Sequence, residues 1–85
     1  MIDIGVVESV DVVAGKSIVA VRLEVDLDKV PLEAGAVSIK FSNQVHANKL
    51  SGHKWWPERQ QIDLLFDSIE VLPQLGDAVF VSLDG

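Results

Sequence analysis

The residues best suited to chemistry lie together in one short segment, His53-Lys54-Trp55-Trp56-Pro57-Glu58-Arg59. This segment holds both tryptophans of the chain and one of its two histidines. Neighbouring residues of a strand point to opposite faces, so the two indole rings cannot both enter one core. At least one ring is therefore expected to cover a surface or to line a groove. The residues expected to bind a partner or a ligand are His53, Lys54, Trp55, Trp56 and Arg59.

Catalytic and metal-binding chemistry is disfavoured by the residue types present. The chain has no cysteine, and its serines lie in no Gly-x-Ser-x-Gly setting. His46 and His53 do not have the i, i+4 spacing of a helical pair of zinc ligands. The carboxylates of Asp63 and Asp67 are expected to solvate a surface, because so small a domain rarely builds the deep cleft that a glycosidase needs. We therefore expect no enzyme, no metal site and no cofactor.

The chain is acidic, and its charges are unevenly distributed. Its net charge is −6, and residues 60–85 carry five acidic side chains and no lysine or arginine. Binding to nucleic acid relies on lysines and arginines that neutralise phosphates, so a nucleic-acid partner is not favoured. The basic side chains gather instead in residues 36–59, as Lys40, Lys49, Lys54 and Arg59. A basic strip on an acidic body favours a partner of mixed or negative charge.

Targeting and membrane signals are not evident in the sequence. Residues 1–5 have neither the basic nor the apolar region of a secretory signal. No apolar run approaches the roughly 20 residues of a membrane span, and the lack of cysteine fits a reducing compartment. We expect a cytoplasmic protein without a membrane partner, folded as a single domain over residues 1–85.

Period-two alternation predicts a β-hairpin at the N-terminal end. Residues 2–13 place apolar side chains at even positions, and residues 19–27 alternate more regularly still. The short turn Ala14-Gly15-Lys16 joins the two runs. Glu8 interrupts the apolar face of the first run, so we expect either a bulge near Gly5 to Glu8 or a bend that carries one end of the strand out of the core.

Two further strands are predicted after the hairpin. Residues 37–42 and 77–83 alternate between apolar and polar side chains, as strands do. Residues 43–57 are polar, and we expect a loop or a short extra strand there, because about 15 residues is long for a structureless connection.

Residues 58–72 form the ambiguous element. A helix over this range would gather its apolar side chains on one stripe and would have Pro57 in its first turn, where proline is favoured. A strand would also alternate, but Leu65 would then fall on the polar face. The helix is favoured, which predicts an α+β fold: a small antiparallel sheet of four to five strands with one helix packed on it. If residues 58–72 are extended, the chain is instead an all-β, five-stranded small barrel.

Two functions from different classes fit these features. The first is a non-catalytic protein–protein interaction module that forms a homo-oligomer, expected to be a dimer, or binds another protein, because Val-rich strands with an exposed edge invite pairing. The second is a small-ligand-binding module with a pocket near Trp55 and Trp56. Weaker alternatives are an acidic inhibitor or immunity-type protein and a single-stranded nucleic-acid binder, in which the tryptophans would stack on bases.

Overall fold

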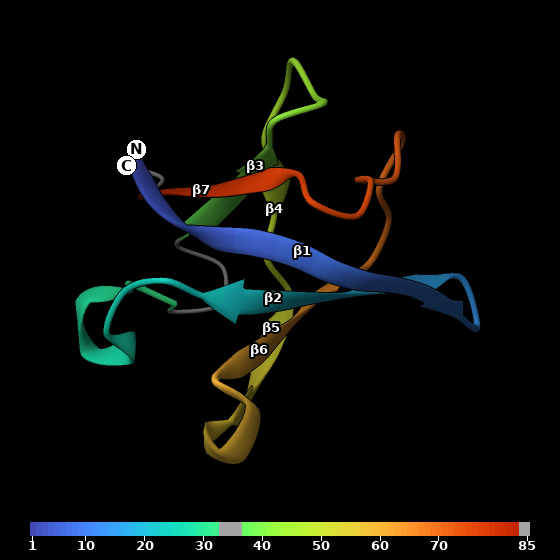
Figure 1. Ribbon diagram of the computed structural model, residues 1–85. Helices are drawn as coiled ribbons and strands as arrows, with labels where there is room; N and C mark the ends of the chain where they lie inside the picture. The colour runs from blue at the N-terminus through green and yellow to red at the C-terminus, as the bar shows by residue number, and fades with distance from the viewer. Residues whose placement is uncertain (33–36, 84–85) are drawn as a thin grey trace.

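The computed structural model describes residues 1–32 and 37–83, which form one antiparallel sheet of seven strands (Figure 1). The described residues contain no α-helix, and none of their helical segments is long and apolar enough to cross a membrane. Two 3-10 turns, η1 (Leu27–Lys29) and η2 (Pro57–Arg59), lie in the connections. The strands are β1 (Ile2–Val13), β2 (Lys16–Leu23), β3 (Val37–Phe41), β4 (Asn48–Lys49), β5 (Gly52–Trp56), β6 (Gln61–Phe66) and β7 (Ala78–Leu83).

The two edge strands of the sheet are consecutive in the sequence, so the sheet must curve strongly to bring its two ends together. The strand order is β4-β3-β7-β1-β2-β6-β5, and only Leu50 and Ser51 separate β4 from β5. The Leu50 N–H donates to the Val37 carbonyl at 3.1 Å, beside β4 and β3. The next N–H, of Ser51, donates to the Leu65 carbonyl of β6 at 2.8 Å. One stretch of chain therefore passes from one end of the sheet to the other, and the sheet takes the shape of a partial barrel.

The hydrophobic core fills the inner face of this curved sheet. The rings of Phe41 on β3 and Phe66 on β6 meet edge to face, with their centroids 5.9 Å apart. These strands lie near opposite ends of the strand order, so the contact closes the core across the curve. The core residues of β3 and β6 alternate along each strand: Val37, Ile39 and Phe41 on one, Ile62, Leu64 and Phe66 on the other.

The predicted helix over residues 58–72 is wrong, and with it the α+β fold class; the all-β alternative fits better. The chain makes η2 and then β6, and no helix or strand follows until β7. Gln60 has the left-handed dihedral angles φ 49° and ψ 40°, which end the 3-10 turn before a helix can grow. Leu65 would spoil the polar face of an isolated strand, but here it lies opposite Ile18 of β2, and both are partly buried. A neighbouring strand thus supplies the apolar contact that the local pattern lacks.

The other predicted strands are confirmed, with changes at their ends. The N-terminal hairpin is present, but β2 stops at Leu23 and the residues up to 27 lead into η1. The strands expected at 37–42 and 77–83 correspond to β3 and β7. Residues 43–57 contain both β4 and β5, so the sheet has seven strands rather than five.

The expected bulge in β1 is found, and it changes which residues face the core. The register shifts between Asp3 and Gly5 against β7, and again between Val7 and Ser9 against β2. Each shift moves the alternation by one residue. The inward-facing residues of β1 are therefore Ile4, Val7 and Val10, rather than the even positions throughout.

Candidate functional site

The tryptophan segment is positioned by β5 and η2. Trp55 lies opposite Ile62 of β6 and packs against the core, whereas Trp56 lies opposite Gln61. The two rings belong to opposite faces of the sheet, as alternation along a strand requires. Both are only partly buried, so each ring also covers some surface.

Trp56 is the centre of a polar cluster on the outer face. Its indole Nε1–H donates to Asp63 Oδ2 at 2.9 Å, and Gln61 Nε2 donates to the other carboxylate oxygen at 2.9 Å. The Lys54 ammonium lies 4.2 Å from the centroid of the Trp56 ring, and the Arg59 guanidinium carbon lies 5.7 Å from it. These contacts are cation–π interactions. The ring thus already has partners within the chain, and the cluster ties η2 to β6.

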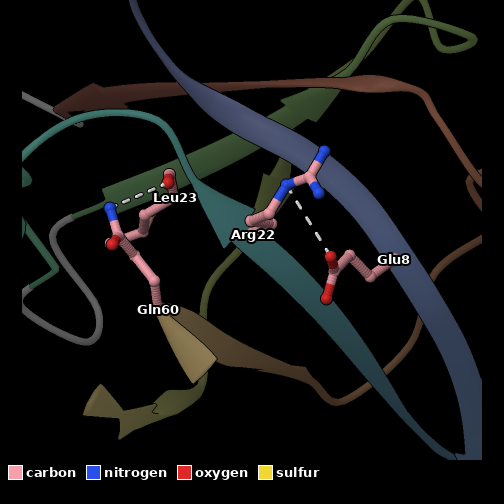
Figure 2. Close-up of polar contacts among 4 residues, drawn as sticks. All are labelled: Glu8, Arg22, Leu23 and Gln60. Carbon is pink, nitrogen blue, oxygen red and sulfur yellow. Dashed lines mark hydrogen bonds and ion pairs between the residues drawn. The ribbon is translucent and has the colours of Figure 1, made fainter. Parts of the chain in front are cut away.

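The return from η2 into β6 is fixed by Gln60 (Figure 2). The Gln60 carbonyl accepts the Leu23 N–H at 3.0 Å, and the Gln60 side-chain Nε2 donates to the Leu23 carbonyl at 3.3 Å. One residue in the left-handed conformation therefore satisfies both main-chain groups at the end of β2. This arrangement holds Arg59 next to the Trp56 ring.

The five predicted binding residues do not form one site. Lys54, Trp56 and Arg59 come together, but exposed His53 lies opposite Leu64 of β6, in phase with Trp55. Neither tryptophan lines any of the four main hollows of the described surface. Within the described ranges, no group of three or more His, Asp or Glu side chains is arranged to hold a metal ion.

A second candidate surface lies along β1, which extends well beyond its neighbour β7. The β7 ladder covers β1 only from Ile2 to Val6, whereas the β2 ladder runs from Gly5 to Val13. The last contacts on the β7 side belong to Val7, whose N–H donates to the Asp77 carbonyl and whose carbonyl accepts the Gly76 N–H, both at 2.9 Å. Beyond Val7, β1 has a strand on one side only, as far as the chain is described.

The hairpin register shows which main-chain groups of β1 face outward. Val13 and Lys16 flank the two-residue loop and form the closing pair of the ladder. In antiparallel pairing, opposed residues alternate between pairs that exchange hydrogen bonds and pairs that do not. The closing pair of Val13 and Lys16 exchanges hydrogen bonds, so Asp11, two residues before Val13, also bonds towards β2. Val10 and Val12 lie at the alternate positions, and they direct their N–H and C=O groups away from β2. We call residues Val10–Val13 the β1 edge.

A hollow of about 480 Å³ adjoins the β1 edge. Two segments of the chain form its walls, Glu8–Val10 and Pro73–Leu75. A tight turn holds the second wall in place: the Gln74 N–H donates to Asp77 Oδ2 at 2.8 Å, and the Asp77 N–H donates back to the Gln74 carbonyl at 3.0 Å. Leu75, which lines the hollow, is 70% exposed. The hollow therefore lies beside β1 close to where the β7 ladder ends.

The β1 edge combines exposed apolar side chains with a free carboxylate. Val12 and Val13 are 56% and 58% exposed. The Asp11 carboxylate makes no ion pair or hydrogen bond with any residue that the structure describes. The arginine of the same hairpin already has a partner: Arg22 Nε lies 3.7 Å from Glu8 Oε1 across β1 and β2, as Figure 2 shows.

Sequence reasoning expected an exposed strand edge but did not locate it. The available signal was the length of the Val-rich run over residues 2–13 compared with the run over residues 77–83. That comparison becomes informative only when β7 is known to be the neighbour of β1, which is a long-range pairing. No protein-family model, curated protein or solved structure matches this chain, so the candidate surfaces rest on its own geometry.

Proposed function

We propose that this chain is a non-catalytic protein–protein interaction module that accepts an extended segment of a second polypeptide along the β1 edge. The observation that carries this proposal is the outward direction of the Val10 and Val12 main-chain groups beside an open hollow. An unpaired strand edge is a template for a further strand, because each new residue pair can exchange main-chain hydrogen bonds. The partner is a second copy of the chain or another protein.

The expected affinity is modest, because the edge is short. Each main-chain hydrogen bond contributes about 0.5–1.5 kcal/mol net of the bonds lost to water. The exposed side chains of Val12 and Leu75 add apolar area that a bound segment would cover. Side-chain burial and main-chain pairing thus act together, as in other complexes formed by strand addition.

The direct test is a display selection from a library of random seven-residue peptides. The selection is carried out on the wild-type protein and on two variants. Val12→Pro removes the outward N–H, and Val12→Ala loses the same apolar side chain but keeps the N–H. In the described structure the Val12 N–H has no main-chain partner within the fold, so the proline is expected to leave the folded protein intact. We expect peptides that bind the wild type and Val12→Ala but not Val12→Pro.

A second copy as partner is tested in the same experiment series. If a second copy is the partner, light scattering over a hundredfold range of concentration gives a mass that rises with concentration in the wild type and remains that of the monomer in Val12→Pro. The proposal is contradicted if the mass stays monomeric and the selection yields no peptide that distinguishes Val12→Pro from Val12→Ala. The ligand-binding alternative gains no support from the four main hollows of residues 1–32 and 37–83, because neither Trp55 nor Trp56 lines one of them.

A further inference from the structure

We infer that the segment accepted by the β1 edge is basic: an extended strand that alternates apolar residues with lysine or arginine, rather than a second copy of this chain. The inference rests on the proposed function and adds the chemistry of the partner. It follows from the two faces of the β1 edge and from the charges around it.

The core-side face of the β1 edge selects apolar side chains. Val10 packs against the core, and Val12 lies on the same face two residues further along, 56% exposed. Leu75 lines the same hollow as Val10. A strand placed beside β1 presents every second side chain to this face. Apolar residues at those positions would cover Val12 and Leu75 and remove their surface from water.

The opposite face selects a cation. The side chain on this face between Val10 and Val12 is Asp11, whose carboxylate has no partner in the described part of the chain. The two basic side chains of the β1–β2 hairpin are already paired: Arg22 with Glu8, and Lys16 with Asp67, each at 3.7 Å. The net charge of −6 also repels an acidic segment. A lysine or arginine opposite Asp11 would form a cross-strand ion pair.

A second copy fits this edge poorly in each symmetric antiparallel register, whether the two-fold axis passes at Val10, Asp11 or Val12. If the two-fold axis passes at Asp11, two hydrogen-bonded pairs form, but Asp11 then faces its own counterpart, and like charges directly opposite each other are destabilising. If the axis passes at Val12, only one hydrogen-bonded pair forms, because the next outward residue, Ala14, belongs to the turn and has φ 52°. If it passes at Val10, Val12 would have to pair with Glu8, which lies at the register shift between Val7 and Ser9, so again only one regular pair forms. Self-pairing is therefore either repulsive or very short.

The experiment compares two capped five-residue peptides, one alternating lysine with valine and one alternating glutamate with valine. Each is titrated into the full chain and followed by the amide shifts in NMR spectra, which also report whether each variant is folded. We expect the lysine peptide to bind the wild type at least about fivefold more tightly than the glutamate peptide. Asp11→Lys is expected to reverse this preference, and Asp11→Asn to reduce it. Glu24→Lys is the control, because it makes the same charge change at an exposed residue just beyond β2.

The outcomes separate this inference from the proposed function. If both peptides bind the wild type equally and Val12→Pro abolishes both, strand addition stands and the basic partner is overturned. If the wild type forms dimers that Val12→Pro abolishes, a second copy is the partner and the inference is also overturned. If neither peptide binds, and the display selection also yields no segment whose binding depends on Val12, both proposals fail. A preference that Glu24→Lys alters as much as Asp11→Lys would reflect net charge alone and would overturn the role of Asp11.

Discussion

At the residue scale, Gly5 has the least room for a side chain among the glycines that the structure describes. A Cβ atom at Gly5 would lie 1.9 Å from the Arg22 carbonyl oxygen of β2, and the residue has φ 157°. The clash is with main chain, so it can be relieved only if β1 and β2 move apart. The close approach occurs at the register shift of β1, where the phase of the strand changes.

We expect Gly5→Ala to lower the free energy of unfolding by about 2 kcal/mol or more, because overpacking against main chain costs about 1–3 kcal/mol and the register shift cannot relax. Urea unfolding followed by tryptophan fluorescence gives the measurement. Gly52→Ala is the matched control, since a Cβ there meets nothing within 4 Å. Equal losses in the two variants would contradict the steric argument.

Trp56 gives a second prediction at this scale. Trp56→Phe keeps an aromatic ring between Lys54 and Arg59 but removes the Nε1–H that donates to Asp63. We expect a loss of stability of about 1 kcal/mol, the usual net value of such a bond at a partly buried site. A double-mutant cycle with Asp63→Ala isolates the interaction. Additive effects of the two substitutions would show that the hydrogen bond contributes nothing.

At the element scale, the β1–β2 hairpin has a turn whose residues do not fully match its backbone. Both central residues have positive φ, 52° at Ala14 and 80° at Gly15, as a type I′ turn requires. Glycine adopts this conformation without strain, but alanine does not. We expect Ala14→Asn, which creates the favoured Asn-Gly pair, to raise the free energy of unfolding by about 0.5–1 kcal/mol. Thermal unfolding measures the change; an unchanged or lower midpoint would contradict it.

The strands of this fold could largely be predicted from alternation, and the predicted helix shows why one element could not. Val37, Ile39 and Phe41 alternate with polar residues, so β3 follows directly from the pattern. In β6, Leu65 is an apolar residue at an outward position, where the alternating pattern calls for a polar one. Its place is explained only by Ile18 of β2, which lies opposite it. The same residues also fit a helical stripe. A local pattern cannot choose between these two readings when the deciding contact comes from a strand more than forty residues away.

At the scale of the whole molecule, the candidate site depends on which strands are neighbours. The tryptophan segment could be selected from the sequence because its residue types are unusual in this chain. The structure places its two tryptophans on opposite faces of the sheet. The β1 edge could not be selected from the sequence in this way, because valines and one aspartate are ordinary residues for a strand. It becomes a candidate site only because β7 stops pairing at Val6 while β2 continues to Val13. Topology, rather than composition, determines where this chain has unpaired main chain.

The most direct measurement is amide hydrogen exchange of the β1 edge, residue by residue, with and without the alternating lysine–valine peptide. Because Val10 and Val12 direct their N–H groups outward, we predict that these two amides exchange markedly more slowly when the peptide is bound. The Asp11 amide already bonds towards β2, so its exchange should change much less. A peptide that binds and slows exchange evenly across the sheet, or that leaves Val10 and Val12 unchanged, would contradict strand addition at this edge.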